Sequence, residues 1–151
     1  MELGLNDKVA IVTGSSRGIG RSIALGFADE KCHLSLCARG EEQLILTEQE
    51  VARKGVDTLA TVGDLTTAEG INRVVDVTLK KWGRIDILIN NVGGSVWNPF
   101  VEVSDEEWLH VFNLNMFAAV RATRAVLPTM LEQESGSIIT ISSIFGREAG
   151  G

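Results

Sequence analysis

Three glycines close together have the spacing of a phosphate-binding turn. Gly14, Gly18 and Gly20 follow the short apolar run of residues 9–12 and precede a helical pattern. A strand that enters a helix through such a turn presents the unpaired amides and positive dipole end of the helix to an anion. Glycine also permits a tight turn and the close approach of a diphosphate. The segment predicts a dinucleotide site, to which we also assign Ser16, Arg17 and Ile19, rather than a plain structural connection.

Chemically distinctive residues follow each further strand that the sequence predicts. Short apolar or β-branched runs at residues 33–38, 56–62, 85–89 and 137–141 alternate with helical patterns, which predicts parallel strands with right-handed crossovers. Ligands of such sheets bind at the carboxyl ends of the strands. The residues found there are Arg39, then Asp64 and Leu65, then Asn90 to Gly94, and finally Ser143. We therefore expect one binding edge.

The elements that must position these residues form an α/β fold with a doubly wound parallel sheet. A length of 151 residues suits a single domain over residues 1–151. The spacing of Ile19, Ile23 and Phe27 predicts the sheet-facing side of the first helix. Two capping boxes are expected, Thr66 with Glu69 and Ser104 with Glu107.

A long helix is predicted over residues 104–131, and it is apolar on nearly all sides. Such a helix must be covered twice, once by the sheet and once by another helix of this chain or of a partner. We therefore expect a homodimer or homotetramer formed through this helix, or further sequence that covers it. The strand at residues 137–141 should be an exposed edge.

Composition excludes several classes of partner. The net charge of −6 and the absence of a basic run argue against a nucleic-acid or membrane surface. No apolar run is long enough to span a bilayer and the first residues lack a signal-peptide core, so we expect a cytoplasmic location. Cys32 and Cys37 flank one predicted strand and are expected to be packing thiols rather than a disulfide or metal ligands. No metal site is predicted.

Two arginines favour NADP over NAD. A carboxylate at the end of the second strand would hold the ribose 2′-hydroxyl of NAD, whereas an arginine accommodates the 2′-phosphate of NADP. Arg39 stands in that region, no acid precedes Glu41, and Arg17 in the glycine turn is a second cation within reach. A guanidinium suits a phosphate dianion. The alternative is that both arginines are merely solvated.

The glycine spacing with Thr13, the segment Asn90-Asn91-Val92-Gly93, and Asp64, Asn115 and Ser143 together resemble the short-chain dehydrogenase/reductase family, over essentially the whole chain. The family segment reads Asn-Asn-Ala-Gly, so Val92 departs from it. The resemblance implies hydride transfer between a nicotinamide and a carbonyl or alcohol substrate. For the cofactor, it implies that Asp64 and Leu65 contact adenine and that Asn91, Val92 and Gly93 line the ribose. For the reaction, it implies that Asn115 holds a water in a proton path and that Ser143 hydrogen-bonds the substrate oxygen.

Three of these assignments have alternatives. Asp64 is also a plausible turn former, and Ser143 follows a strand as many turn serines do. Asn115 is also a plausible satisfied core amide near a local bend, and it competes with Asn113. Residues 96–100 either wall an apolar substrate pocket or simply pack their own loop.

The family's proton donor is a tyrosine in a Tyr-x-x-x-Lys segment, and this chain has no tyrosine. We therefore expect the chain to be the amino-terminal portion of an NADP-dependent reductase. The alternative is a truncated, catalytically inactive module that binds a nucleotide or a partner.

Overall fold

The fold is built on a sheet of five parallel strands. The computed structural model describes residues 3–146 of the chain, and the sheet within them has the order β3-β2-β1-β4-β5. The strands are β1 Val9–Thr13, β2 His33–Ala38, β3 Thr58–Val62, β4 Ile87–Asn90 and β5 Ser137–Thr140. The expected series of strands is confirmed, with several ends shifted by one or two residues. β5 forms one edge and all its residues are exposed, as predicted.

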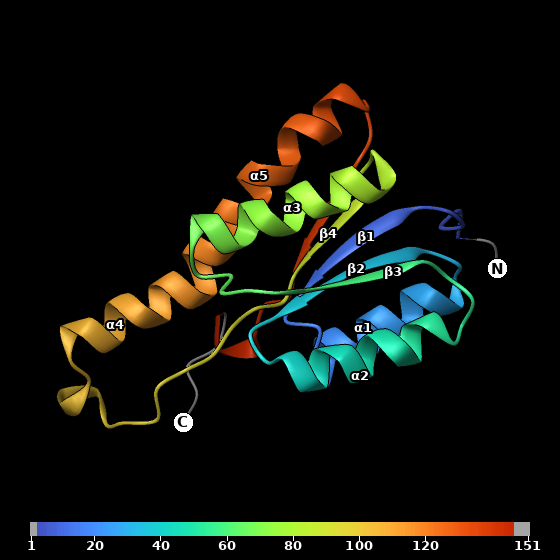
Figure 1. The fold of residues 1–151 in the computed structure, drawn as a ribbon. Coiled ribbons are helices and arrows are strands. Elements are labelled where there is room, and N and C mark those ends of the chain that lie inside the picture. The colour runs from blue at the N-terminus through green and yellow to red at the C-terminus, as the bar shows by residue number, and fades with distance from the viewer. Residues whose placement is uncertain (1–2, 147–151) are drawn as a thin grey trace.

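Helices cover both faces of this sheet, as Figure 1 shows. α1 and α2 pack on one face, and α3 and α5 pack on the other. Along β1, Ala10 and Val12 belong to the first core and Ile11 to the second, which is the alternation expected of a strand covered on both sides. The helices are α1 Gly18–Asp29, α2 Glu41–Ala52, α3 Ala68–Trp82, α4 Asp105–Phe112 and α5 Ala118–Glu132.

The side of α1 that meets the sheet consists of small residues. Its buried residues are Gly20, Ala24 and Ala28. The predicted sheet-facing side is therefore wrong for Ile19, which is 61% exposed, while Ile23 and Phe27 lie only at the margin of the core. Small side chains let the helix come close to the strands, so the larger residues are displaced to either side of the contact line.

The next two helices each bury one stripe of residues at helical spacing. The buried residues of α2 are Leu44, Thr47 and Val51, and those of α3 are Ile71, Val74, Val75 and Thr78. Gly83 ends α3 with φ +68°, as a left-handed C-cap.

The predicted capping box of Thr66 and Glu69 is wrong by one residue. Thr67 is the N-cap, and its hydroxyl accepts a hydrogen bond from the Gly70 N–H at 3.0 Å. Thr66 bonds Asp64 instead, through both its N–H and its hydroxyl. Two adjacent threonines offer the same chemistry, so the local pattern cannot choose between them.

The long helix of residues 104–131 is confirmed in extent but not in regularity. The predicted capping box of Ser104 and Glu107 begins α4, and a π-helical segment, Asn113–Phe117, joins α4 to α5. Such segments are often found at functional sites. Exposed apolar side chains remain along this stretch, as expected: Trp108, Leu109, Phe112, Met116, Phe117, Val120, Leu127 and Leu131.

Both cysteines are free, buried thiols, as predicted. Burial raises the pKa of Cys32 and that of Cys37 to about 12, so both stay protonated near neutral pH. No helix in the described part of the chain is long and apolar enough to cross a membrane. Within residues 3–146 we find no cluster of histidine, cysteine or acidic side chains that would hold a metal ion.

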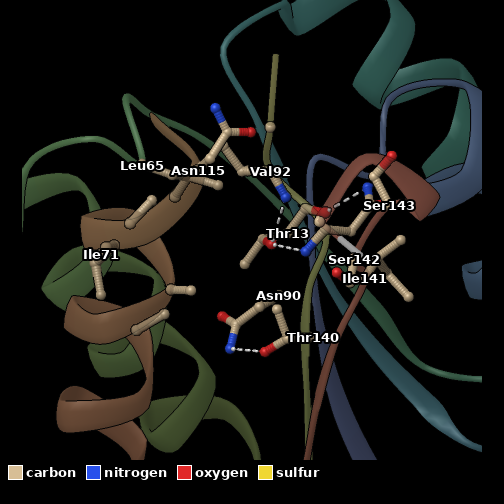
Figure 2. A pocket seen from close by; sticks show the side chains of 16 residues that line it. Thr13, Leu65, Ile71, Asn90, Val92, Asn115, Thr140, Ile141, Ser142 and Ser143 are labelled. Carbon is tan, nitrogen blue, oxygen red and sulfur yellow. Dashed lines mark hydrogen bonds between the residues drawn. The ribbon is translucent and has the colours of Figure 1, made fainter. Parts of the chain in front are cut away.

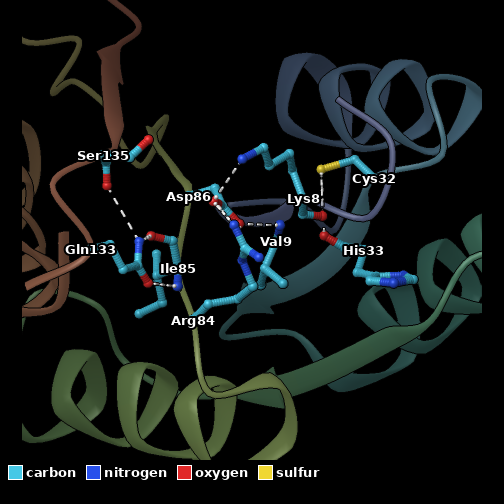
Figure 3. A network of polar contacts seen from close by, with 9 residues as sticks. All are labelled: Lys8, Val9, Cys32, His33, Arg84, Ile85, Asp86, Gln133 and Ser135. Carbon is cyan, nitrogen blue, oxygen red and sulfur yellow. Dashed lines mark hydrogen bonds and ion pairs between the residues drawn. The ribbon is translucent and has the colours of Figure 1, made fainter. Parts of the chain in front are cut away.

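Asp86, just before β4, is a buried carboxylate that joins the amino-terminal ends of β1 and β4 (Figure 3). It accepts the Val9 N–H at 2.9 Å and the Arg84 Nη2 at 2.6 Å, and it pairs with Lys8 at 3.4 Å. Burial by itself raises the pKa of Asp86, but the hydrogen bonds from Arg84 and Val9 and the charges of Arg84 and Lys8 together hold it below its ordinary value. The carboxylate is therefore needed in its charged form.

We predict that Asp86→Asn lowers the free energy of unfolding at pH 7 by about 1.5–3 kcal/mol, the value of hydrogen bonds to a charged group. A lowered pKa in the folded state means that this stabilisation is present above the unfolded value of about 4 and is lost as the pH falls through the folded value. Urea unfolding between pH 7 and pH 2.5 should show the two proteins converging below about pH 4. Asp76→Asn, at an exposed position of α3, is the control. If the difference in free energy of unfolding between wild type and Asp86→Asn does not change with pH, the charge of Asp86 is not the cause of the stabilisation.

Candidate functional site

Two adjoining cavities lie at the carboxyl edge of the sheet, where the strand order reverses between β1 and β4. The phosphate-side cavity, of about 500 Å³, is lined by the glycine turn and the ends of β2 and β3. The serine-side cavity, of about 390 Å³, is lined by α5, the π segment and the end of β5. Both volumes are in the range of small-molecule sites. The cavities share Leu65, Asn91, Val92 and Gly93.

The structure places nearly all the sequence-predicted site residues in these two cavities. In the phosphate-side cavity, outside the shared wall, are Gly14, Ser16, Arg17, Gly18, Ile19, Arg39 and Asp64. Asn115 and Ser143 line the serine-side cavity. Gly20 lines neither and is buried beneath the turn, so its part in the site is to let the turn form.

The glycine turn has the backbone geometry that the sequence predicts. Gly14 and Gly18 have φ of +67° and +56°, in the left-handed region that favours glycine. A Cβ on Gly18 would meet no atom within 4 Å, so its backbone faces open space. A Cβ on Gly20 would lie 2.3 Å from the Gly14 carbonyl oxygen. Arg17 is the N-cap of α1 without a side-chain cap, and the first turn of α1 carries no acid, which suits an anion.

Thr13 joins the glycine turn to the segment after β4. Its buried hydroxyl donates to the Ile89 carbonyl at 3.0 Å and accepts the N–H groups of Asn91 and Val92 at 2.8 and 3.2 Å. The Asn91 amide in turn donates to the carbonyls of Thr13 and Gly14. The role of this hydroxyl has no local signal in the sequence, because its partners are 76 to 79 residues away.

Asn115 is a satisfied amide that braces the wall shared by the cavities. Its Nδ2 donates to the carbonyls of Gly94 and Val111 at 2.7 and 2.9 Å, and its Oδ1 accepts the Gly94 N–H at 3.0 Å. A Cβ on Gly93 would lie 2.8 Å from that oxygen. Asn113, the competing candidate, lines neither cavity and bonds Arg121 instead.

Asp64 serves a turn, the alternative that the sequence left open, and also faces the phosphate-side cavity. It accepts the N–H and the hydroxyl of Thr66 at 2.9 and 2.8 Å. These two hydrogen bonds, assisted by the charge of Arg39, keep the pKa of Asp64 below its ordinary value. The carboxylate is therefore an acceptor at neutral pH.

Figure 2 shows the serine-side cavity between α5 and the strand ends, with Asn115 on the helical side and Ser143 on the β5 side. At its base, the Asn90 Nδ2 lies 3.4 Å from the Thr123 and Thr140 hydroxyls. Ile71, Ala118 and Ala122 supply an apolar wall. The cavity thus combines a few polar groups with an apolar lining, as small-molecule sites do.

Several residues of the site lack a local sequence signal. Gln43 and Thr66 line the phosphate-side cavity, and Thr140, Ile141 and Ser142 line the serine-side cavity. The signal that could have identified them is their place at or shortly after the carboxyl end of a predicted strand or, for Gln43, in the first turn of α2.

Residues 96–100 wall neither cavity, so the first of their two alternatives, an apolar pocket wall, is not found. Trp97 and Phe100 are 90% and 79% exposed, and the Phe100 ring contacts Trp108 edge-on with centroids 6.0 Å apart.

The fold and the site define a nucleotide-binding α/β protein of the Rossmann type. The family model described as short chain dehydrogenase matches residues 8–151, and the chain belongs to this family of oxidoreductases.

Curated relatives agree with this assignment. The chain is 43% identical over 142 residues to 1,6-dihydroxycyclohexa-2,4-diene-1-carboxylate dehydrogenase of Acinetobacter baylyi, covering 93% of this chain and 54% of that protein. It is 34% identical over 140 residues to 3-oxoacyl-(acyl-carrier-protein) reductase of Staphylococcus aureus, covering 92% and 57%. The chain therefore spans about half the length of the relatives that it matches.

Solved structures have the same fold. L-sorbose reductase from Gluconobacter frateurii, complexed with NADPH and L-sorbose, superimposes with a TM-score of 0.94 at 38% identity, covering 97% of this chain and 56% of that one. NAD⁺-bound xylitol dehydrogenase superimposes with a TM-score of 0.92 at 31% identity and the same coverage. The predicted family and fold class, a Rossmann-like parallel sheet through the fifth strand, are confirmed.

We predict that Gly20→Ala destabilises the fold by about 1–3 kcal/mol, the usual cost of overpacking. The new methyl group would meet the Gly14 carbonyl and force the turn apart. Gly26→Ala is a matched control in the same helix, where a Cβ meets open space, and it should stabilise by about 0.5–1 kcal/mol. Urea unfolding measures the free energy of unfolding of both variants. Equal changes in the two variants would show that residue 20 is not in tight contact with the Gly14 carbonyl.

Proposed function

We propose that the protein is an NADP(H)-dependent oxidoreductase that transfers a hydride between the nicotinamide cofactor and a small carbonyl or alcohol substrate. The observation that carries this proposal is the pair of adjoining cavities with a common wall at residues 91–93. One cavity has the phosphate-binding turn and the other has Asn115 and Ser143, so a dinucleotide extended along the edge would bring its reactive end to them.

The residues present fit a dinucleotide. The backbone of Gly18 faces open space beside the uncapped start of α1, which leaves room for a diphosphate at the helix N-terminus. Leu65 and the ionised Asp64 line the cavity on the β3 side, where they offer an apolar surface and an acceptor for the adenine ring and its amino group. Asn91, Val92 and Gly93 would line the nicotinamide ribose, as the family resemblance implies.

The arginines support NADP over NAD. Relatives do not decide the matter, since one solved structure is complexed with NADPH and another with NAD⁺. In this chain Arg17 and Arg39 are both exposed on the wall of the phosphate-side cavity, and neither forms an ion pair with a carboxylate of the described residues. A guanidinium that is not held in an ion pair is available to bind the dianionic 2′-phosphate, although the charge of Arg39 also acts on Asp64.

The chemistry follows from the two polar groups of the serine-side cavity. When bound, the nicotinamide supplies or accepts the hydride. We propose that Ser143 donates a hydrogen bond to the carbonyl oxygen of the substrate, which stabilises the negative charge that develops there. Asn115, whose amide is held by Gly94 and Val111, would keep a water in the proton path.

Self-association is a further part of the proposal. The exposed apolar side chains of residues 108–131 offer a surface for a second copy. We propose a homodimer or homotetramer formed through this surface.

We predict that Arg39→Asp shifts the cofactor preference toward NAD. The substitution removes a cation for the 2′-phosphate and provides an acceptor for a ribose hydroxyl. The ratio of the Kd of NAD⁺ to that of NADP⁺ should fall about tenfold or more, as measured by calorimetry. Arg53→Asp, at an exposed position after α2, should leave the ratio unchanged. An unchanged ratio in Arg39→Asp would refute the role of this arginine.

We predict that the 151-residue chain binds NADPH but does not oxidise it in the presence of carbonyl substrates. The family's proton donor is a tyrosine, and the chain contains none. The loss of NADPH absorbance should match the protein-free rate, while calorimetry detects binding. Turnover above that rate would contradict the mechanism. Absence of binding to both NADPH and NADH would contradict the proposed function itself.

A further inference from the structure

Arg121 in α5 connects two parts of the site that are far apart in the sequence. Its Nη1 donates to the Thr66 carbonyl at 2.8 Å and to the Asn113 Oδ1 at 2.6 Å. The guanidinium carbon also lies 5.6 Å from the centre of the Phe117 ring. Arg121 is half-buried and lines neither cavity. It therefore acts on the site only through the groups that it holds.

The first of these groups belongs to the loop of residues 64–67, which follows β3. The loop fixes its own shape, because Asp64 accepts two hydrogen bonds from Thr66 and the Thr67 hydroxyl donates to the Asp64 carbonyl. A Cβ on Gly70 would lie 2.1 Å from that carbonyl oxygen, so α3 starts in close contact with the loop. These bonds are internal to the loop and to its junction with α3. Outside them, Leu65 packs into the core between α3 and α5, and Arg121 donates from α5 to the Thr66 carbonyl.

The second group belongs to the π segment. Asn113 begins this segment, and Asn115, two residues further on, pairs with Gly94 at the wall shared by the cavities. Arg121 thus connects the loop on the adenine side of the phosphate-side cavity with the segment that carries Asn115.

We propose that Arg121 is a positioning residue that holds the loop of residues 64–67 against the π segment and so sets the affinity for the adenine end of the cofactor. This inference rests on the proposed function, because it takes the phosphate-side cavity as the dinucleotide site. Arginine suits the task because the two N–H groups of its Nη1 lie in the rigid plane of the guanidinium and hold the two oxygen acceptors in fixed directions.

The test uses adenosine 2′,5′-bisphosphate, which contains only the adenine end of NADP⁺, and compares it with whole NADP⁺. Arg121→Met keeps the aliphatic part of the side chain and removes the donors. We expect the Kd of both ligands to rise by the same factor, about tenfold, because only the adenine end is affected. Arg121→Lys should recover part of the loss. Arg124→Met, at an exposed position three residues further along α5, should stay within about twofold of wild type.

Asn113→Ala removes the acceptor of the hydrogen bond between Arg121 and Asn113 instead of the donor. It leaves the bond to Thr66 in place but releases the guanidinium, so a smaller rise in Kd is expected, and it provides the test if Arg121→Met does not fold. Circular dichroism confirms folding before each titration. An unchanged Kd in Arg121→Met overturns the inference, and so does an unchanged Kd in Asn113→Ala where that variant provides the test. A rise in the Kd of NADP⁺ that exceeds the rise for the bisphosphate also overturns it. If wild type binds neither ligand, the proposed function and this inference fail together.

Discussion

The site depends first on one hydroxyl group, that of Thr13. A threonine hydroxyl has one donor and two acceptor positions, and the bonds to Ile89, Asn91 and Val92 use all three. Thr13 is the last residue of β1, and its partners lie at the end of β4 or just after it. These bonds therefore hold the ends of β1 and β4 together at the point where the strand order reverses. The crevice of an open α/β sheet forms at that point. Both cavities share residues 91–93 for this reason.

The glycine turn, which we propose binds the cofactor, is also needed for close packing. A Cβ on Gly14 would lie 3.1 Å from the Asn91 amide nitrogen, and the Gly14 N–H donates to the Cys37 carbonyl at 2.9 Å. Gly20 then lies directly against the Gly14 carbonyl, which brings α1 close to the sheet. Of the three glycines, only Gly18 has open space beside it. Close contacts at Gly14 and Gly20 and the positive φ of Gly14 and Gly18 therefore favour glycine at all three positions, and Gly18 also leaves the room that a ligand needs.

The sequence predicted features that local chemistry determines. Strand positions and the residues at each strand end follow from periodicity and from the rule on carboxyl ends. The sequence did not predict features whose cause lies far away along the chain or in packing. The partners of Thr13 are more than 75 residues away, the cap of α3 was a choice between adjacent threonines, and the extra residue of the π segment changes no pattern of composition. The face of α1 was misplaced because its contact requires small residues rather than large ones.

Binding and turnover are assigned to different parts of this chain. On the proposed function, the groups of the phosphate-side cavity hold the cofactor equally well before and during hydride transfer, and binding of that kind lowers the dissociation constant without accelerating the reaction. On the same proposal, acceleration requires groups that act on the substrate oxygen, for which we propose Ser143 and a proton donor. The 151 residues contain that serine but no tyrosine. Cofactor affinity and catalysis should therefore be separable in this chain, with affinity set by residues that come together before the fifth strand.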